Sequence, residues 1–465
     1  MYAPREEYTV EKLFYRNREI NKIGFWGLGR SNLGLLYRFK DKYPYLEFTL
    51  RADAPPKSSD AILNNFAEIR LGEAAGLDFY EDAVFFSPSV RRERFRVPSS
   101  EIIFSSDAEY FTENTRSDVF AITGSDGKST TVTLCSMLLS AVYRDAFAIG
   151  NIGEAMTPFL DKSPDTAAVC ELSSFQLSYF SPSVKRSLIT NITPNHLNWH
   201  SSFSEYISAK ENIHRNSREA VLNADCPVAS EIGKKYPLFS VYSAAKDITQ
   251  IKSEYNSEHY VYVKNNTIFH NGHPLLDIGG IACRGNHNVN NYIAAVAMCC
   301  DMPIEEALVK TAKTFTGLPH RCQTVAKING IEFINSSIDS SPQRTQTTLS
   351  SLPDGLTVIL GGKGKGLGFD SLIPILLKKA KAIFLTGETG KEISDLLTLA
   401  SKRHSVDIAF SYFENFDDAV LSAAKGAKSG DRVILSPAST SFDRFSSFEE
   451  RGEHFTKLIN SFFEQ

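Results

Sequence analysis

The stretch Thr123-Gly124-Ser125-Asp126-Gly127-Lys128-Ser129-Thr130-Thr131 constrains the fold more than any other part of this chain. It follows an apolar run at residues 119–122 and precedes a helical pattern over residues 132–141. This order predicts a strand, a glycine turn and a helix N-terminus, the arrangement of a phosphate-binding loop. Backbone N–H groups and the helix dipole converge there on phosphate oxygens, Lys128 adds a full positive charge, and the Ser129 hydroxyl can ligate Mg²⁺.

The loop is shorter than the standard eight-residue motif. The pattern G-x-x-x-x-G-K-[ST] would need glycine at position 122, where Ile122 stands, so only G-x-x-G-K-S is present. A pattern this short also arises by chance, and an ordinary glycine turn is therefore the alternative. The strand before the loop and the helix after it favour a nucleotide triphosphate site.

Composition excludes several other classes of protein. A length of 465 residues suggests three domains. The net charge of −4 shows no basic footprint for nucleic acid, and no apolar run is long enough for membrane insertion. The N-terminus lacks the apolar core of a signal peptide, so we expect a cytoplasmic protein. Seven scattered cysteines without C-x-x-C spacing argue against disulfides or a thiolate metal site, and Cys299-Cys300 is interpreted as core filler.

The first segment, residues 1–111, has the pattern of a small α/β domain. Gly27 and Gly29 follow a short apolar strand and open a helix around residues 33–39, which suggests a pyrophosphate on a helix N-terminus. Asn32 stands where G-x-G-x-x-G has its third glycine, which makes NAD a poor candidate. Further strands are predicted at residues 47–50, 83–86 and 102–104.

The second segment, residues 112–316, contains two more apolar runs that end in potential metal ligands. Residues 166–170 lead into Glu171, and residues 187–190 lead through Asn191 to His196. Ligands gather at the carboxyl ends of parallel strands, so both side chains are expected near the phosphates. A carboxylate suits Mg²⁺ well and imidazole less so, and from the residues alone His196 fits a structural histidine better than a ligand. In the third segment, residues 317–465, strands are predicted at 330–334, 356–360, 382–385 and 432–435.

Taken in order along nearly the whole chain, these pieces resemble the Mur ligase family. The most discriminating strings are Glu171-Leu-Ser-Ser-Phe-Gln-Leu177 and Leu435-Ser-Pro-Ala-Ser-Thr-Ser-Phe-Asp443 with Phe448-Glu-Glu-Arg-Gly452. The other markers are Gly27-Leu-Gly-Arg-Ser31, the loop at 123–131, Gly150-Asn-Ile-Gly153, Asn191-Ile-Thr-Pro-Asn-His196, Gly285-Asn-His-Asn-Val-Asn-Asn291, Gly317-Leu-Pro-His-Arg321 and Gly361-Gly-Lys-Gly-Lys365.

The resemblance implies an α/β fold of three domains. Residues 1–111 would form a Rossmann-like domain that binds a UDP-sugar, residues 112–316 a P-loop ATPase-like domain with a mostly parallel sheet, and residues 317–465 a Rossmann-like domain that binds an amino acid. The implied reaction is ATP-dependent amide formation through an acyl phosphate. The branch that it resembles joins glutamate, as the D-isomer, to UDP-N-acetylmuramoyl-L-alanine in peptidoglycan precursor synthesis, and we expect a cytoplasmic monomer.

The resemblance also implies a role for individual residues. It places Lys128, Glu171, His196, Lys210 and Asn151 in catalysis, and Ser129, Glu171, His196 and Lys210 around two Mg²⁺ ions. Lys210 would do so as a CO₂-derived carbamate, because a free ammonium would repel the metal. The remaining residues divide into an ATP set (Gly124, Ser125, Asp126, Gly127, Lys128, Ser129, Thr130, Asn288, Asn291, Arg321), a UDP set (Gly29, Arg30, Ser31, Ser87, Asn151) and an amino-acid set (Lys365, Ser441, Phe448).

The chain departs from the family pattern at a few positions, mostly on the amino-acid side. The usual Asn-Asp-Ser-Lys-Ala-Thr-Asn reads here Asn335-Ser-Ser-Ile-Asp-Ser-Ser341, so an acid and a base become Ser336 and Ile338. Lys363 replaces an acidic residue, Asn198 replaces Asp, and Asp126 stands where Asn is usual. Alternatives are therefore a related ligase for L-glutamate, another amino acid or folate, although a full N-terminal domain disfavours the folate enzymes. A nucleotide-binding relative without turnover is the non-enzyme alternative.

Overall fold

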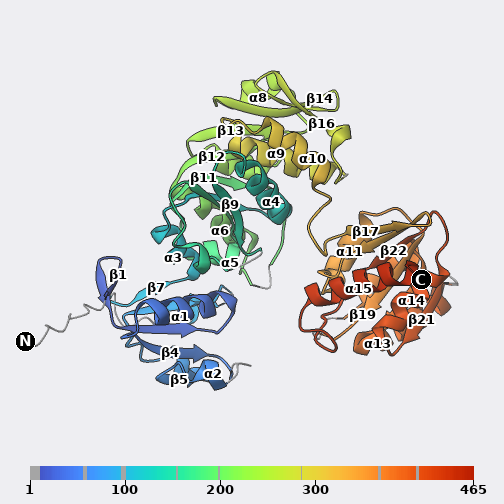
Figure 1. Cartoon of the computed structure of the whole chain (residues 1–465), viewed down its shortest axis with the longest axis horizontal. Coiled ribbons are helices and arrows are strands. Elements are labelled where there is room, and N and C mark those ends of the chain that lie inside the picture. Colours follow the sequence, from blue (N-terminus) through green and yellow to red (C-terminus); the bar gives the residue numbers. More distant parts are fainter. Residues whose placement is uncertain are drawn as a thin grey trace, which may run out of the picture. The chain divides into compact units, whose positions relative to one another are not determined.

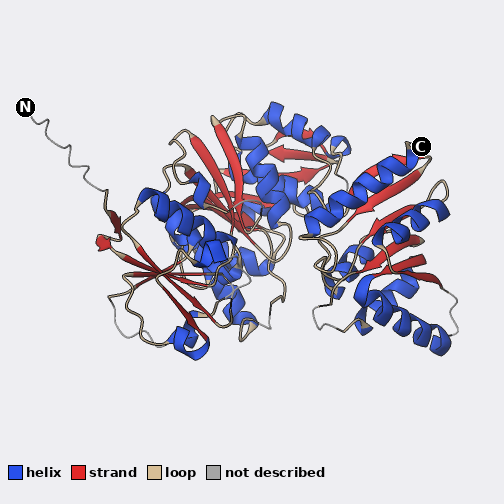
Figure 2. Cartoon of the chain, turned by 60° about the horizontal axis from the view of Figure 1, so that its bottom comes forward, coloured by secondary structure: helices blue, strands red, loops and turns tan. Residues whose placement is uncertain are grey.

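The computed structural model describes residues 11–464, apart from 56–59, 89, 96–100, 153–154, 197–198, 284, 365–367 and 405–407. The chain divides into two compact units, Met1–Thr314 and Phe315–Gln465. In each sheet described below, helices alternate with mostly parallel strands (Figure 2), which confirms the α/β class. In the part of the chain that the structure describes, no helix has the length and apolar character needed to cross a membrane.

The first sheet of the N-terminal unit has five parallel strands in the order β5-β4-β3-β6-β7. Strand β3 lies in its middle and is almost entirely buried. The chain leaves β3 at Gly27, the point at which the strand order reverses. A two-stranded hairpin, β1 and β2, precedes this sheet. The bounds are β1 Leu13–Tyr15, β2 Arg18–Ile20, β3 Lys22–Trp26, α1 Arg30–Lys42, β4 Glu47–Ala52, α2 Asp60–Leu63, β5 Glu68–Leu71, β6 Ala83–Phe86, β7 Ile103–Ser105 and α3 Asp107–Asn114.

The second sheet of this unit has nine strands in the order β16-β15-β14-β13-β12-β11-β8-β10-β9. The strands from β14 to β9 pair in parallel, whereas β14, β15 and β16 form antiparallel hairpins at one edge. The strands are β8 Asp118–Thr123, β9 Asp145–Gly150, β10 Thr166–Glu171, β11 Val184–Ile189, β12 Ser217–Asn223, β13 Leu238–Ser243, β14 His259–Lys264, β15 Thr267–His270 and β16 His273–Asp277.

Helices α4 and α9 pack on each other beside this sheet (Figure 1). Both carry apolar residues around most of their circumference, a pattern typical of a buried helix, and α9 is buried continuously from Asn291 to Cys299. The helices of this part are α4 Lys128–Leu139, α5 Ser174–Leu177, α6 Phe203–Arg215, α7 Pro227–Gly233, α8 Ile248–Glu254, α9 Asn286–Cys299 and α10 Glu305–Thr314.

The C-terminal unit has one six-stranded sheet in the order β17-β18-β22-β19-β20-β21. All of its pairs are parallel except β17 with β18. Its bounds are β17 Gln323–Ile328, β18 Ile331–Asn335, α11 Pro342–Ser350, β19 Leu356–Gly361, α12 Ile373–Lys379, β20 Ala380–Thr386, α13 Gly387–His404, β21 Ala409–Phe413, α14 Phe416–Gly426, β22 Arg432–Leu435 and α15 Phe448–Phe463.

The strands that the sequence predicted overlap observed strands, with ends that differ by up to three residues. The sequence did not predict several polar strands, among them the edge strands β5, β16 and β17 and the hairpin strand β15. These strands have mixed or exposed side chains, so they lack the continuous apolar run that marks a central parallel strand.

Candidate active site

The loop between β8 and α4 approaches neighbouring backbone and side chains too closely for any residue but glycine. Gly124 has φ +152°, and a Cβ there would lie 1.9 Å from Thr190 Oγ1. Gly127 has φ +76°, and a Cβ there would lie 2.4 Å from Asn291 Oδ1. Helix α4 begins directly after Gly127, so its first N–H groups open into the loop. The strand, glycine turn and helix predicted from the sequence are all present.

Side chains from the end of β11 hold the backbone of the loop. The Asp126 carbonyl accepts hydrogen bonds from Thr190 Oγ1 at 2.6 Å and from Asn191 Nδ2 at 3.2 Å, and the Asp126 N–H donates to Asn191 Oδ1 at 2.9 Å. Lys128 Nζ donates to the Ser125 carbonyl at 2.9 Å. Asp126 itself is exposed, so the unusual carboxylate is not buried against the phosphate site.

Glu171 ends β10 beside the loop and is 2% exposed. Its Oε1 accepts a hydrogen bond from Asn151 Nδ2 at 2.9 Å, and its backbone carbonyl accepts one from the Asn151 N–H at 3.0 Å. Gly150 permits this approach, because a Cβ at its φ of +105° would lie 2.4 Å from the Glu171 carbonyl oxygen. Glu171 Oε2 is buried without a hydrogen-bond partner among the described residues. A buried carboxylate oxygen in this state is suited to a cation.

Lys210, on α6, is brought to the same end of the sheet and is 2% exposed. Its Nζ donates to the Gly124 carbonyl at 2.7 Å and to Thr123 Oγ1 at 3.2 Å. Burial lowers the pKa of this amine well below its usual value, and the charge of Lys128 lowers it further. Burial therefore favours the neutral form of the Lys210 amine.

His196 lies in a cluster of aromatic rings that joins the end of β11 to α5 and α6. It has a left-handed backbone with φ +55°, and its ring lies edge-on to Phe175 at 5.0 Å. His200, which no sequence pattern indicated, is buried beside it and bonds Ser174 Oγ through Nε2 at 2.9 Å. Helix α5 begins with a capping box between Ser173 and Gln176, so much of the Glu-Leu-Ser-Ser-Phe-Gln-Leu string shapes this turn.

The two asparagines predicted to contact nucleotide lie in the first half of α9. Asn291 is buried and packs against Gly127, and its Oδ1 accepts from Thr131 Oγ1 at 3.4 Å. Asn288 Oδ1 accepts from Asn291 Nδ2 at 3.3 Å. Both residues therefore lie beside the phosphate loop. Arg321 belongs to the C-terminal unit, and its expected contact with phosphate stays a prediction.

In the N-terminal sheet, the turn after β3 is stabilised by the residue that replaces the third glycine. Asn32 is fully buried, and its Nδ2 donates to the carbonyls of Gly27 at 2.8 Å, Phe85 at 3.1 Å and Trp26 at 3.2 Å. Ser87 lies across this turn, since a Cβ on Gly27 would be 2.9 Å from its Oγ. Residues Gly29, Arg30 and Ser31 open α1 beside it.

Arg51, near the end of β4, is part of the core of this sheet. It is fully buried in an ion pair with Glu81, with Nε–Oε1 at 2.8 Å. Its remaining N–H groups donate to the carbonyls of residues 75, 77 and 78. The arginine thus ties β4 to the loop before β6, a structural role.

In the C-terminal unit, the string Phe448-Glu-Glu-Arg-Gly452 opens α15 and packs onto the strand ends. Arg451 is 1% exposed and donates to Ser337 Oγ at 2.9 Å, the Ser337 carbonyl at 2.9 Å and the Ser439 carbonyl at 3.1 Å. Ser441 is buried in the loop after β22, and Phe448 is the first residue of α15. Lys365 lies outside the described residues.

Lys363, the residue that replaces the family's acidic one, lies directly beside Ser441. Its backbone N–H donates to the Thr440 carbonyl at 2.9 Å, and the Thr440 N–H donates back to the Lys363 carbonyl at 3.0 Å. The Lys363 side chain is exposed. Ser336 accepts from the Cys322 N–H at 3.1 Å, and Asp339 accepts from Ser436 Oγ at 2.7 Å. The altered Asn335–Ser341 segment is therefore hydrogen-bonded to the start of the unit and to the end of β22.

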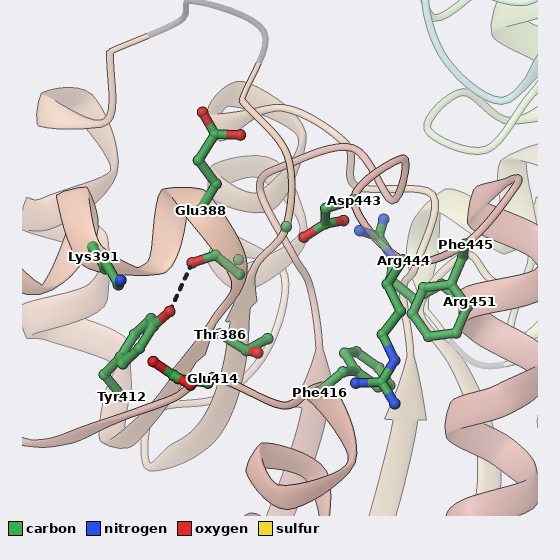
Figure 3. Close-up of a pocket in the computed structure, with 13 residues that line it drawn as sticks. Thr386, Glu388, Lys391, Tyr412, Glu414, Phe416, Asp443, Arg444, Phe445 and Arg451 are labelled. Carbon is green, nitrogen blue, oxygen red and sulfur yellow. Dashed lines mark hydrogen bonds between the residues drawn. The ribbon is translucent and has the colours of Figure 1, made fainter.

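A pocket of about 600 Å³ lies at the carboxyl ends of β19, β20 and β21 (Figure 3). Ser441 and Phe448 are not among its lining residues, although Asp443 and Arg444 of the same loop are. The Tyr412 hydroxyl donates to the Gly387 carbonyl across its floor at 3.4 Å. The sequence did not predict this pocket. Gly361, Gly362, Asp443 and Arg451 belong to the family strings, but the other lining residues lie outside them and are brought in by the strand order. The lining consists of Gly361, Gly362, Thr386, Gly387, Glu388, Lys391, Tyr412, Glu414, Phe416, Asp443, Arg444, Phe445 and Arg451.

Models of the Mur ligase middle domain and of the Mur ligase glutamate ligase domain match residues 122–299 and 320–439. The chain is 34% identical to the UDP-N-acetylmuramoylalanine–D-glutamate ligase of Ruminiclostridium cellulolyticum over 96% of this chain and 98% of that one. It is 32% identical to the enzyme of the same name from Clostridium novyi, over 98% and 100%. The chain therefore belongs to the Mur ligase family, and the relatives that it matches along nearly their full length carry the D-glutamate ligase name.

Solved structures of the family share the fold. One is the UDP-N-acetylmuramate-alanine ligase MurC of Thermotoga maritima, with a TM-score of 0.56 at 18% identity over 95% of this chain and 99% of that one. Another is MurF of Acinetobacter baumannii, with a TM-score of 0.53 at 16% identity over 96% and 94%. Mur ligases use ATP and Mg²⁺. The glycine loop and the unpartnered Glu171 oxygen fit these two ligands.

Proposed function

We propose that this chain joins D-glutamate to UDP-N-acetylmuramoyl-L-alanine and converts ATP to ADP and phosphate. The observation that carries the proposal is the convergence of the phosphate loop, Glu171 with Asn151, and Lys210 at neighbouring strand ends of one sheet. The names of the nearly full-length relatives supply the substrates.

Each residue at this strand end has a task that its position suits. The loop N–H groups and Lys128 would hold the phosphates of ATP, with Ser129 and Glu171 toward the metal. Bound Mg²⁺ would neutralise charge on the transferring phosphoryl group. Asn151 would orient Glu171 and face the carboxylate that receives the phosphoryl group. Positioning of this kind accounts for most of the rate in phosphoryl transfer.

We further propose that Lys210 carries a carbamate. Burial favours the neutral amine, which is the form that attacks CO₂. The attack would form an N–C bond and release one proton to solvent, and the product would be an anionic oxygen ligand. Together with Glu171 and His196, this ligand would hold a second Mg²⁺. A Lys210→Ala variant should lose activity and recover part of it with short carboxylic acids, with wild-type protein plus the same acids as the control. Activity like that of the wild type in the unsupplemented variant would refute this role.

The main experiment is an amino-acid panel with ATP and UDP-N-acetylmuramoyl-L-alanine, read by phosphate release. We expect D-glutamate to give the highest kcat/KM, with L-glutamate and other amino acids well below it. A preference for another amino acid would assign the chain to a different ligase of the family. No turnover with any amino acid, together with intact ATP binding, would support a non-catalytic relative. A Lys128→Ala variant controls for contaminating ATPase.

A further inference from the structure

A second cluster of potential metal ligands lies at the hairpin edge of the nine-stranded sheet. His259 begins β14, His270 ends β15, and Cys300 directly follows α9. One ring nitrogen of each histidine and the Cys300 sulfur all lie within 4.8 Å of one another. The two rings are already hydrogen-bonded, with His259 Nδ1 and His270 Nε2 separated by 3.0 Å.

The surroundings hold these three side chains in place. The Phe239 ring packs on His259 at 4.7 Å, and the Arg186 guanidinium lies over Phe239 at 3.4 Å. Arg186 also donates to both carboxylate oxygens of Asp301, at 2.8 and 2.6 Å. Asp301, the residue after Cys300, is therefore held in an ion pair with Arg186. The Ser240 hydroxyl donates to the Ala297 carbonyl at 2.7 Å and pins α9 to β13.

Protons must leave or move before the cluster can bind a metal. Burial lowers the pKa of His270, and the neighbouring His259 and His273 lower it further. Burial raises the pKa of the Cys300 thiol to about 12, so the thiol keeps its proton when nothing is bound. A neutral imidazole is the form of histidine that binds metal, whereas cysteine must first lose a proton.

We propose that His259, His270 and Cys300 form a Zn²⁺ site, separate from the Mg²⁺ region around Glu171. Two imidazoles and one thiolate are typical zinc ligands and poor magnesium ligands. In a tetrahedral site with Zn–N near 2.0 Å and Zn–S near 2.3 Å, ligand atoms stand roughly 3.3 to 3.8 Å apart, which the cluster reaches with small side-chain shifts. Three ligands from the described residues leave the fourth position for water. The cysteine spacing pointed away from a thiolate site, because these ligands come from three separate elements.

Binding releases a single proton. The Cys300 thiol gives its proton to solvent as the sulfur–metal bond forms. Whichever histidine donates the hydrogen bond between the rings must carry its proton on its other nitrogen instead, which changes the tautomer and not the charge. The site should therefore bind Zn²⁺ more tightly as the pH rises.

The position of the site gives it a structural consequence. Zinc would join the β14–β15 hairpin to the C-terminal end of α9. The same helix carries Asn291, which packs on Gly127 of the phosphate loop nine residues earlier, or roughly 14 Å along the helix axis. The metal would fix one end of the helix whose other end supports the loop, and it should raise stability without contacting substrate.

The test is a titration of the metal-free full chain with Zn²⁺ and, separately, Co²⁺, in saturating Mg²⁺ and ADP. We expect one equivalent of Zn²⁺ to bind and raise the unfolding temperature by a few degrees. Co²⁺ should give a thiolate-to-metal charge-transfer band, which reports this cluster because the Mg²⁺ region contains no cysteine among its proposed ligands. Both signals should be lost in Cys300→Ser and His259→Gln and kept in Cys322→Ala, a matched variant in the C-terminal unit.

Circular dichroism of the metal-free variants separates loss of a ligand from loss of fold, and two independent ligand variants keep the comparison possible if one misfolds. The proposal is overturned if wild-type protein shows no charge-transfer band with Co²⁺. It is equally overturned if Cys300→Ser and His259→Gln, both folded, bind Zn²⁺ as the wild type does.

Discussion

Gly150 offers a direct test of the geometry that brings Asn151 to Glu171. An alanine Cβ at this position would lie 2.4 Å from the Glu171 carbonyl oxygen and 2.8 Å from Met156 Cε, at a φ of +105°. Backbone strain at such a φ costs about 1–3 kcal/mol, and forced overpacking costs about 1–3 kcal/mol more. We therefore expect Gly150→Ala to lower the free energy of unfolding by about 4 kcal/mol.

Two other glycines of the same unit separate these contributions. Gly72 has φ +63°, and no atom lies within 4 Å of the position that an alanine Cβ would take, so Gly72→Ala carries backbone strain alone, about 1–2 kcal/mol. Gly280 has open space and no positive φ, so Gly280→Ala should change stability by less than about 1 kcal/mol. Urea unfolding followed by tryptophan fluorescence reports the N-terminal unit, because both tryptophans, Trp26 and Trp199, lie in it.

The same substitution tests function. Moving the backbone at Gly150 displaces Asn151 from Glu171, and a shift of about 1 Å in a positioning group can cost about 10²-fold in rate. We expect kcat for phosphate release to fall by that factor in Gly150→Ala and to stay near the wild-type value in the two control variants. Equal stability of Gly150→Ala and Gly72→Ala, with unchanged kcat, would refute the reasoning.

Four single side chains give further expected outcomes. Glu171→Gln keeps the hydrogen bond from Asn151 but loses the charge, so phosphate release should need about 10–100-fold more Mg²⁺; an unchanged Mg²⁺ dependence would remove Glu171 from the metal site. Lys363→Ala should raise the KM for the amino acid more than that for ATP, because the backbone of Lys363 pairs with Thr440, next to Ser441, and its charged side chain is exposed; equal effects on both KM values would argue against this. Asn32→Ala removes the two amide hydrogens that three buried carbonyls share and should lower the stability of the N-terminal unit by about 2–3 kcal/mol in urea unfolding, whereas an unchanged midpoint would count against these bonds. Burial raises the pKa of Asp339, so at pH values between its unfolded and folded pKa the native state keeps a proton that the unfolded state has lost. The free energy of unfolding therefore decreases as pH rises through that window. This decrease, measured by circular dichroism, should be smaller in Asp339→Asn, and the same pH dependence in both proteins would contradict it.

Much of the candidate active site could be predicted from the sequence, because its residues lie in short motifs. The phosphate loop and Glu171 each follow a buried apolar run, and Asn151 came from the family resemblance. The structure places all three at adjacent strand ends of one sheet. The family strings add structural residues to this picture. Arg451 and Gln176 belong to discriminating strings, yet in the structure they support the loop after β22 and the start of α5.

The structural roles of some single residues could not be predicted from sequence patterns, because their contacts lie far away along the chain. Asn32 looked like a defect in a glycine motif, whereas its amide bonds three carbonyls that come from β3, the following turn and β6. Arg51 lies near the end of a strand, where ligands often bind, yet Glu81 neutralises it in the core. In both cases a partner is 30 to 53 residues away, beyond any local periodicity.

The sequence alone determined the family, the α/β class and the presence of a phosphate loop, because strand and helix periods, glycine turns and strand-end side chains are local properties of the chain. Only the tertiary structure decided the strand order and the polar edge strands of the sheets. It also brought Lys210 onto the Gly124 carbonyl, Asn291 against Gly127, and His259, His270 and Cys300 within 4.8 Å of one another. These contacts join residues that are distant along the chain, and their distances follow from the register and packing of whole elements, which no short stretch of sequence encodes.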